Sequence, residues 1–171
     1  MANVLVPSIL PGGYTLLAQS SLAGASVTFS NIPQNYRDLY LVTSNYRPTT
    51  NDQPLVCRIN GVSSTAYRNV ATTDAQNTAL TFASTFAQLT ANNSSSAGNG
   101  MSTALFQDYT NSNTWKSVFT TATNNDATTT TSVRHRIGFS IHNGTAAITS
   151  LLILSNSGNI TSGNVYLYGV E

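Results

Sequence analysis

The chain of 171 residues carries few charges: 8% of its residues are charged and its formal net charge is +1. Because phosphate recognition depends on clustered lysine and arginine, this composition excludes a basic nucleic-acid-binding protein. The 40% of hydrophobic residues exclude a disordered polyelectrolyte and allow one domain with a sizeable core, whose partner contacts should depend little on salt.

The N-terminal segment is apolar but short, contains Pro7 and has no basic leader, so it is not typical of a secretory signal. No apolar run reaches the length that crosses a bilayer. We therefore expect synthesis in the cytoplasm and no membrane partner. Pro11 and the two glycines after it oppose a regular continuation into the first strand. The sequence predicts an N-terminal arm, residues 1–12, and a single β-sandwich domain, residues 13–171.

This arm is the candidate partner-contact segment, because its side chains are too apolar for a free tail. The residues concerned are Val4, Leu5, Val6, Ile9 and Leu10. We predict that they contact a neighbouring protein. The alternative is an edge strand that folds back on its own sheet.

Strand patterns recur along the chain, and no segment has the periodicity of a long helix. The first predicted strands are residues 14–20, 26–30, 38–46 and 55–59. The dipeptide Asn60-Gly61 favours a tight hairpin turn into residues 62–70. Residues 79–89 fit strand or helical spacing, and we interpret them as a strand. The tract 91–100, rich in Asn, Ser and Gly, is predicted to be an exposed loop.

The second half of the chain continues this pattern. Strands are predicted at residues 101–109, 115–121, 132–142, 147–155 and 165–170, with a polar tract at 124–131. One face of the third of these strands is mostly apolar; its residues are His135, Ile137, Phe139 and Ile141. Asn143-Gly144 is a second hairpin signal. Residues 147–155 are apolar on both faces, which is typical of a strand in the middle of a sandwich.

About nine or ten strands with turn residues between them indicate an all-β fold. The architecture that we expect is an antiparallel β-sandwich, jelly-roll-like in its connections. An up-and-down barrel is the alternative. Either shape has edges or end loops that an assembly can cover.

Groups that could perform chemistry are scarce. His135 and His142 lie an odd number of residues apart on one predicted strand, so they point to opposite faces and cannot share a metal ion. We expect His135 to be partly buried and hydrogen-bonded, and Cys57 to be a buried free thiol. The six acidic residues are interpreted as turn residues or partners of arginine; they are Asp38, Asp52, Asp74, Asp108, Asp126 and Glu171. We predict no metal, no cofactor and no enzyme activity.

The chain has eight tyrosines, and aromatic faces can stack on sugars. This composition leaves a carbohydrate-binding platform open as a functional interpretation. The other interpretation is that tyrosine is an ordinary strand residue, whose ring packs while its hydroxyl reaches solvent.

Several segments, taken in order, resemble a known family. They are GYTLLA at 13–18, VTFSNIPQNYRDL at 27–39, Arg58-Ile59-Asn60-Gly61, DYTN at 108–111 followed by Lys116-Ser117, and LYGV at 167–170. Together they resemble small virion structural proteins of tailed bacteriophages. These motifs mark turns and strands, and no catalytic residues come with them.

The resemblance implies a role in the virus particle. A capsid decoration (cement) protein would lie on the outer capsid surface of the virion, bind across subunits of the major capsid protein and stabilise the shell. Such proteins are ordered around symmetry axes, so a homo-oligomer is expected, a trimer first and a dimer second. The alternative is a tail fibre or baseplate module that binds a host-surface glycan or receptor, with loops 92–99 and 124–130 as contact points. Length favours decoration, because fibres usually carry an added anchor or shaft.

Overall fold

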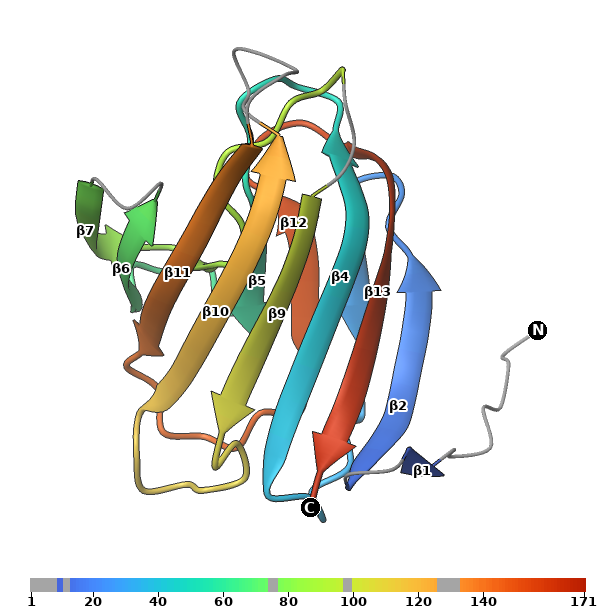
Figure 1. Ribbon diagram of the computed structural model, residues 1–171. Helices are drawn as coiled ribbons and strands as arrows, with labels where there is room; N and C mark the ends of the chain where they lie inside the picture. Colours follow the sequence, from blue (N-terminus) through green and yellow to red (C-terminus); the bar gives the residue numbers. More distant parts are fainter. Residues whose placement is uncertain (1–8, 11–12, 74–76, 97–99, 126–132) are drawn as a thin grey trace.

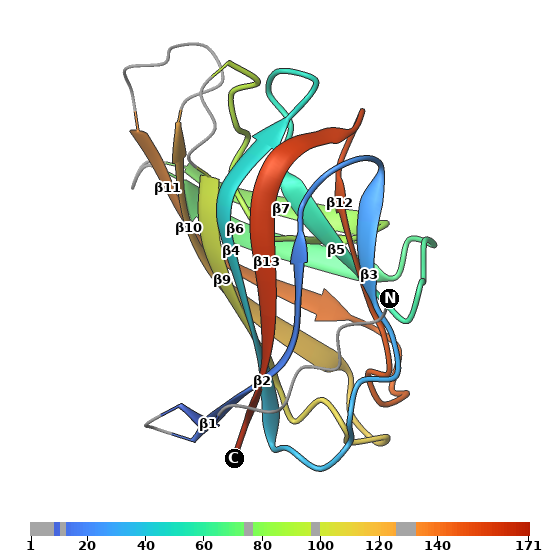
Figure 2. The same ribbon diagram turned by 90° about the vertical axis from the view of Figure 1, so that its right-hand side faces the viewer.

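The computed structural model describes residues 9–10, 13–73, 77–96, 100–125 and 133–171. Among these residues the protein is all-β, with two antiparallel sheets that pack face to face (Figure 1). Figure 2 shows the sheets edge-on, with the strands of the smaller sheet lying along one side of the larger sheet. The predicted antiparallel β-sandwich is confirmed.

The larger sheet, sheet A, has nine strands in the order β1-β2-β13-β4-β9-β10-β11-β6-β7. They are β1 (Ile9–Leu10), β2 (Tyr14–Ser21), β4 (Asp38–Pro48), β6 (Tyr67–Thr73), β7 (Asn77–Ser84), β9 (Gly100–Gln107), β10 (Lys116–Asn125), β11 (Val133–His142) and β13 (Ile160–Val170). Sheet B has four strands in the order β3-β12-β5-β8. They are β3 (Ser26–Phe29), β5 (Leu55–Ile59), β8 (Ala87–Gln88) and β12 (Leu151–Ser155).

The described residues form thirteen strands, more than the nine or ten predicted. Two of them, β1 and β8, are two residues long, which is too short to produce an alternating pattern. The predicted strand at residues 79–89 is divided between β7 in sheet A and β8 in sheet B. Ala83, near the end of β7, has a φ of 57°, a left-handed conformation that interrupts a regular strand.

The hairpin predicted at Asn60-Gly61 is wrong, although both residues have the positive φ angles that the dipeptide favours. The turn leads from β5 in sheet B to β6 in sheet A. Asn60 Oδ1 accepts hydrogen bonds from the backbone N–H groups of Thr149, at 2.9 Å, and Ser150, at 3.1 Å. These bonds fasten the turn to the segment just before β12, which becomes the partner of β5.

The hairpin predicted at Asn143-Gly144 is also wrong. Neither residue has a positive φ, and the chain crosses here from β11 in sheet A to β12 in sheet B. The Asn143 N–H donates to the Ala66 carbonyl at 2.9 Å. This contact directs the chain toward the β5–β6 connection.

The tract 91–100, predicted as an exposed loop, is largely buried where it is described. Ala91, Asn93 and Ser94 are buried. Asn93 Nδ2 donates to the Tyr46 carbonyl at 2.6 Å, and the Asn93 N–H donates to the Gln53 carbonyl at 3.2 Å. A polar side chain can be buried at low cost when its groups are paired in this way. Residues 97–99, and residues 126–131 of the second polar tract, lie outside the described residues.

The hydrophobic core lies between the sheets. Its main contributors are Leu39, Leu41, Phe106, Val165 and Leu167 from sheet A and Leu55, Cys57, Ile59, Leu151 and Ile153 from sheet B. Burying a side chain of this kind stabilises the fold by about 1.5–3 kcal/mol. Cys57 is a buried free thiol, as predicted, and burial raises its pKa. Strand β12 lies in the middle of sheet B, also as predicted.

Candidate interaction surface on sheet A

Strand β11 turns its polar residues toward sheet B and its apolar residues toward solvent. The buried residues Arg136, Gly138 and Ser140 alternate with Ile137, which is 51% exposed, and Phe139, which is 37% exposed. The predicted mostly apolar face of this strand is therefore present, but much of it is exposed to water. The sequence pattern shows that a face exists and does not show which way it points.

Large apolar and aromatic side chains continue the Phe139 position across the outer face of sheet A. Strand register pairs each residue of this set with the next one on the neighbouring strand. The residues are Val70 on β6, Phe139 on β11, Phe119 on β10, Leu105 on β9, Tyr40 on β4 and Tyr168 on β13. We call these six residues the apolar row. The Tyr14 ring packs edge-on against Tyr40, with ring centroids 5.6 Å apart, and against Tyr168, at 6.5 Å.

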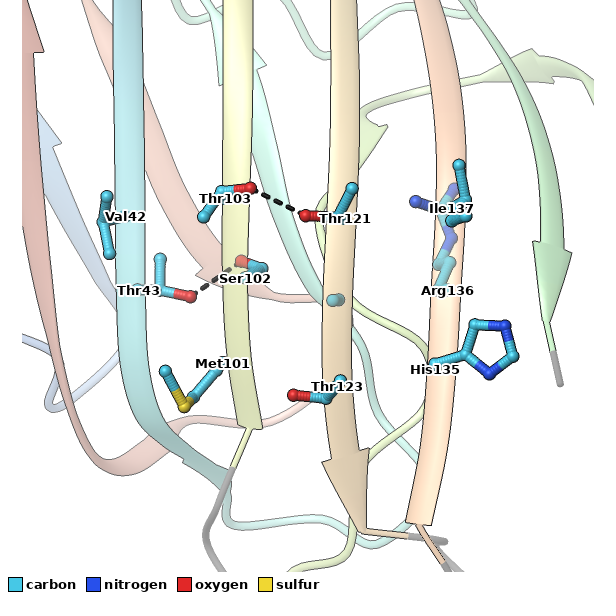
Figure 3. A pocket seen from close by; sticks show the side chains of 11 residues that line it. Val42, Thr43, Met101, Ser102, Thr103, Thr121, Thr123, His135, Arg136 and Ile137 are labelled. Carbon is cyan, nitrogen blue, oxygen red and sulfur yellow. Dashed lines mark hydrogen bonds between the residues drawn. The ribbon is translucent and has the colours of Figure 1, made fainter.

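A shallow depression of about 360 Å³ lies beside the apolar row. Figure 3 shows the lining side chains on β4, β9, β10 and β11; those on the outer face are Val42, Met101, Thr103, Thr121, Thr123, His135 and Ile137. The hydroxyls of Thr103 and Thr121 are hydrogen-bonded to each other at 2.8 Å. Covering these two hydroxyls would therefore cost little, because they already have partners.

Charge is absent from most of this face. Between residues 40 and 44 of β4 and along β9, β10 and β11, no outward-facing side chain is an aspartate, glutamate, lysine or arginine. The titratable groups on these parts of the sheet are the Tyr40 phenol and His135, and Arg68 lies at the margin on β6. Phosphate or an acidic glycan would find little to bind here, whereas an apolar protein surface would fit.

The interior beneath β6 and β11 is occupied by polar groups. Arg136 is 2% exposed, and its Nη1 donates to the Gln88 carbonyl at 3.0 Å and to Thr120 Oγ1 at 2.7 Å. Burial lowers the pKa of Arg136 to about 10, so the guanidinium is charged at neutral pH. Gly138 makes room for it, since a Cβ at that position would collide with Arg136 Nη1.

Asn69 on β6 completes this polar cluster. Its Nδ2 donates to the Phe86 carbonyl at 3.1 Å, and its Oδ1 accepts from the Gln88 N–H at 3.2 Å and from Ser140 Oγ at 2.5 Å. Together, Asn69 and Arg136 satisfy backbone groups on the edge of β8 that faces away from β5. Side chains of sheet A thus close an edge of sheet B that would otherwise be open to pairing.

The two histidines lie on opposite faces of β11, as their spacing predicts. His142 is buried, with its ring 4.7 Å from the Tyr67 ring, and burial together with Lys116 lowers its pKa. His135 is exposed, so the prediction that it is partly buried is wrong. Across the described ranges, no group of three or more His, Cys, Asp or Glu residues could hold a metal ion.

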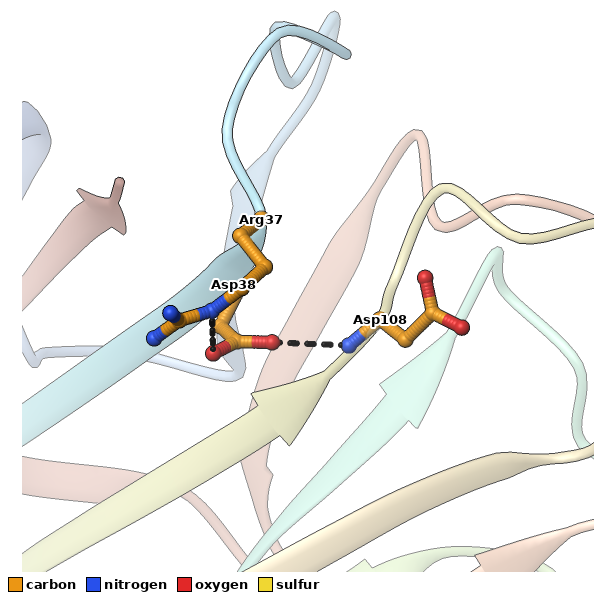
Figure 4. Close-up of polar contacts among 3 residues, drawn as sticks. All are labelled: Arg37, Asp38 and Asp108. Atoms are coloured by element: carbon orange, nitrogen blue, oxygen red, sulfur yellow. Dashed lines mark hydrogen bonds and ion pairs between the residues drawn. The ribbon is translucent and has the colours of Figure 1, made fainter.

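The acidic residues near the start of β4 have structural partners. Asp38 is buried and forms an ion pair with Arg37 at 2.9 Å, while its Oδ1 accepts from the Asp108 N–H at 2.8 Å (Figure 4). The Asp108 carboxylate in turn accepts from Asn111 Nδ2 at 2.7 Å. Their interpretation as turn residues and arginine partners is confirmed. Asp74 and Asp126 lie outside the described residues.

Seven of the eight tyrosines divide into two groups, which composition could not distinguish; the eighth, Tyr36, precedes β4 and packs against the core. Tyr46, Tyr67 and Tyr109 are buried in the core, and the Tyr67 hydroxyl accepts from the Ile59 N–H at 2.8 Å. Four others are half-buried on the strands at the β2 end of sheet A; they are Tyr14, Tyr40, Tyr166 and Tyr168.

The candidate contact residues of the N-terminal arm are only partly described. Ile9 and Leu10 form β1, which pairs with β2 at the edge of sheet A through Ile9 with Thr15 and Leu10 with Tyr14. This pairing agrees with the alternative of an edge strand for these two residues. Val4, Leu5 and Val6 lie outside the described residues, so their contact with a neighbouring protein stays a prediction.

Comparisons of the chain with known protein families, with curated proteins and with solved structures find no match. In the part of the chain that the structure describes, no helix is long and apolar enough to cross a membrane. Function must therefore be argued from the surface itself. The apolar row was missed in the sequence because it depends on the register between strands that are distant in the chain.

Proposed function

We propose that the chain is a non-enzymatic structural protein of a virus particle, a capsid decoration protein that binds across subunits of the major capsid protein and stabilises the shell. One observation carries this proposal: the outer face of sheet A holds the apolar row and is nearly free of charge, and on β11 the polar residues point inward while the apolar residues face solvent. Such a surface suits lasting contact with protein. Because the protein binds the assembled shell and not the separate subunits, it favours the shell by linkage.

A density map of the whole particle, in which this chain is located, tests the proposal. Many copies distributed over the shell would support decoration. A few copies at the tail would support the second candidate, a fibre or baseplate module that binds a host-surface glycan. The four half-buried tyrosines of sheet A favour that candidate, since their rings could stack on sugars. Absence of the chain from the particle would contradict both.

The N-terminal arm is the proposed capsid contact. Deleting residues 2–11 should leave a folded domain, as judged by circular dichroism, that no longer sediments with shells lacking the protein. Attachment equal to that of the full chain would show that the arm has no such role. Unfolding of the truncated chain would show that the arm belongs to its own domain.

A further inference from the structure

The outer face of sheet A has a shape that fits a second copy of itself. We propose that two copies of the chain form a two-fold dimer through this face, with the apolar row of each copy seated in the depression of the other. This inference uses the same sheet face as the proposed function but goes beyond it, because it names a second copy of the chain as the occupant and can be measured on the purified chain without any particle.

The apolar row and the depression lie side by side on the same strands. Moving two residues along β10 leads from Phe119, in the row, to Thr121, and two more lead to Thr123, both in the depression. On β9 the corresponding residues are Leu105, Thr103 and Met101. Two residues span about 7 Å along a strand. On β10 the tall Phe119 is thus followed by two short threonines over about 14 Å, whereas β9 presents the longer Met101 at the far side of the depression.

A two-fold axis that runs parallel to the row, between the row and the depression, exchanges the two features. Under this rotation each strand faces its own copy running in the opposite direction. Phe119 then lies between Thr121 and Thr123 of the second copy. Such a contact is isologous, so it is completed by two copies and leaves no unpaired half. The geometry thus favours the dimer over the trimer that sequence considerations place first.

The lack of charge on the face supports a copy of the same chain as the occupant. An isologous contact brings identical groups near one another around the axis, and like charges there would repel. The central strands β9 and β10 present no charged side chain on this face. A partner with a charged surface would gain nothing from binding here and would lose hydration.

The size of the face is sufficient for a stable dimer. The row crosses six strands, which spans about 24 Å at about 4.8 Å per strand, and eight residues of β9 span about 27 Å. The flat area is therefore roughly 650 Å², and the relief of the side chains adds to it. A standard interface buries about 800 Å² on each partner.

Sedimentation equilibrium of the purified chain tests the proposal with a matched pair of variants. Thr121 and Thr28 are both exposed threonines in strands, Thr121 on the outer face of β10 and Thr28 on β3 of sheet B. We expect a dimer for the unmodified chain, loss of the dimer for Thr121→Lys, and an unchanged dimer for Thr28→Lys. A monomer or trimer for the unmodified chain, or equal behaviour of the two variants, would overturn the proposal.

Mixing experiments test how the two faces meet. Phe119→Lys and Thr121→Glu should each abolish the dimer. Mixing the two chains should restore a mixed dimer, because the ammonium group introduced into one copy would lie beside the carboxylate introduced into the other. Failure of the mixture to dimerise would contradict the seating of the row in the depression.

A cysteine cross-link gives a measurement that does not depend on a charged variant being folded. Cys57 is buried, so a thiol introduced at the surface reacts without competition from it. Thr121→Cys lies near the proposed axis. Packed sheets lie about 10 Å apart, farther than a disulfide reaches, so the two thiols should be joined by a bismaleimide with a spacer of about 10 Å, whereas those of Thr28→Cys should not. Cross-linking at position 28 and not at position 121 would refute the proposed face.

Discussion

Strands β4 and β11 belong to the same sheet, yet they turn their apolar residues in opposite directions. On β4, Leu39 and Leu41 face sheet B and enter the core. On β11, Ile137 and Phe139 face solvent, while Arg136 lies inside. In the described part of the chain, no β11 residue belongs to the hydrophobic core cluster. Around β4, sheet A is stabilised by hydrophobic burial, whereas the inner side of β11 forms a buried hydrogen-bond network with Asn69, Gln88 and Thr120.

This difference shows that apolar residues in a strand do not always report the core of their own domain. The β11 pattern is as regular as the β4 pattern, but its apolar side faces solvent. The polar side is used to close the edge of β8. The following predictions test this division, from the largest expected effect to the smallest.

The largest effect is expected in the apolar half. Leu41→Ala should lower the free energy of unfolding by about 2–5 kcal/mol, because it removes buried methyl groups and leaves a cavity in the core. Urea denaturation at low protein concentration measures this effect. Ile137→Ala, on the outer face, should change the stability of the monomer by less than about 1 kcal/mol. Equal losses at the two positions would show that the outer face contributes to the fold of the single chain.

Removal of the buried guanidinium should come next. Arg136→Met should lower the free energy of unfolding by about 2–3 kcal/mol, because the Gln88 carbonyl and Thr120 Oγ1 each lose a donor in the interior. The exposed Arg68, changed to methionine, is the control and should be nearly neutral. A stable Arg136→Met variant would mean that apolar packing can replace the network, as happens for some buried ion pairs.

The contact between Gly138 and Arg136 predicts a smaller, non-additive effect. Gly138→Ala should lower the free energy of unfolding by about 1–3 kcal/mol, because the added Cβ displaces the Arg136 guanidinium. In the Arg136→Met background the same change should cost much less, since the flexible methionine can move aside. A double-mutant cycle based on thermal or urea unfolding measures this coupling, and purely additive costs would contradict it.

The smallest effect concerns pH. Because the pKa of His142 is lowered in the folded state, the unfolded chain binds the proton more readily, and stability falls as the pH drops below about 6.5. The slope contributed by one group is at most about 1.4 kcal/mol per pH unit. His142→Phe should flatten the dependence of the unfolding free energy on pH between about 7 and 5.5. An unchanged slope in His142→Phe would assign the effect to another group.

Local patterns predicted much of the strand content. Alternation placed β2, β4, β5 and β11 within two residues of their observed ends, because each strand is long enough or flanked by clear turn residues. The connections were harder. Asn60-Gly61 has the expected turn conformation. However, Asn60 Oδ1 accepts a hydrogen bond from the Thr149 N–H just before β12, a contact across 89 residues that no local pattern contains.

The candidate surface could be predicted only in part. The mostly apolar face of β11 is visible in the sequence, as is the opposite placement of the two histidines. The apolar row is not visible, because Val70, Phe119 and Tyr40 are brought into one row only by the register between strands. The burial of Asn93 was equally hidden, since a polar tract gives no sign that its amide pairs with the Tyr46 carbonyl.

Strand β13 lies between β2 and β4, and this position has a consequence for biosynthesis. The β2-β13-β4 part of sheet A can form only after residue 170 has left the ribosome. Until then, no strand lies between β2 and β4 to pair with both. Pairings over such sequence distances give a high contact order and slow folding. Until β13 is made, the nascent chain therefore exposes unpaired apolar strands, and a stop codon before β13 should yield insoluble protein.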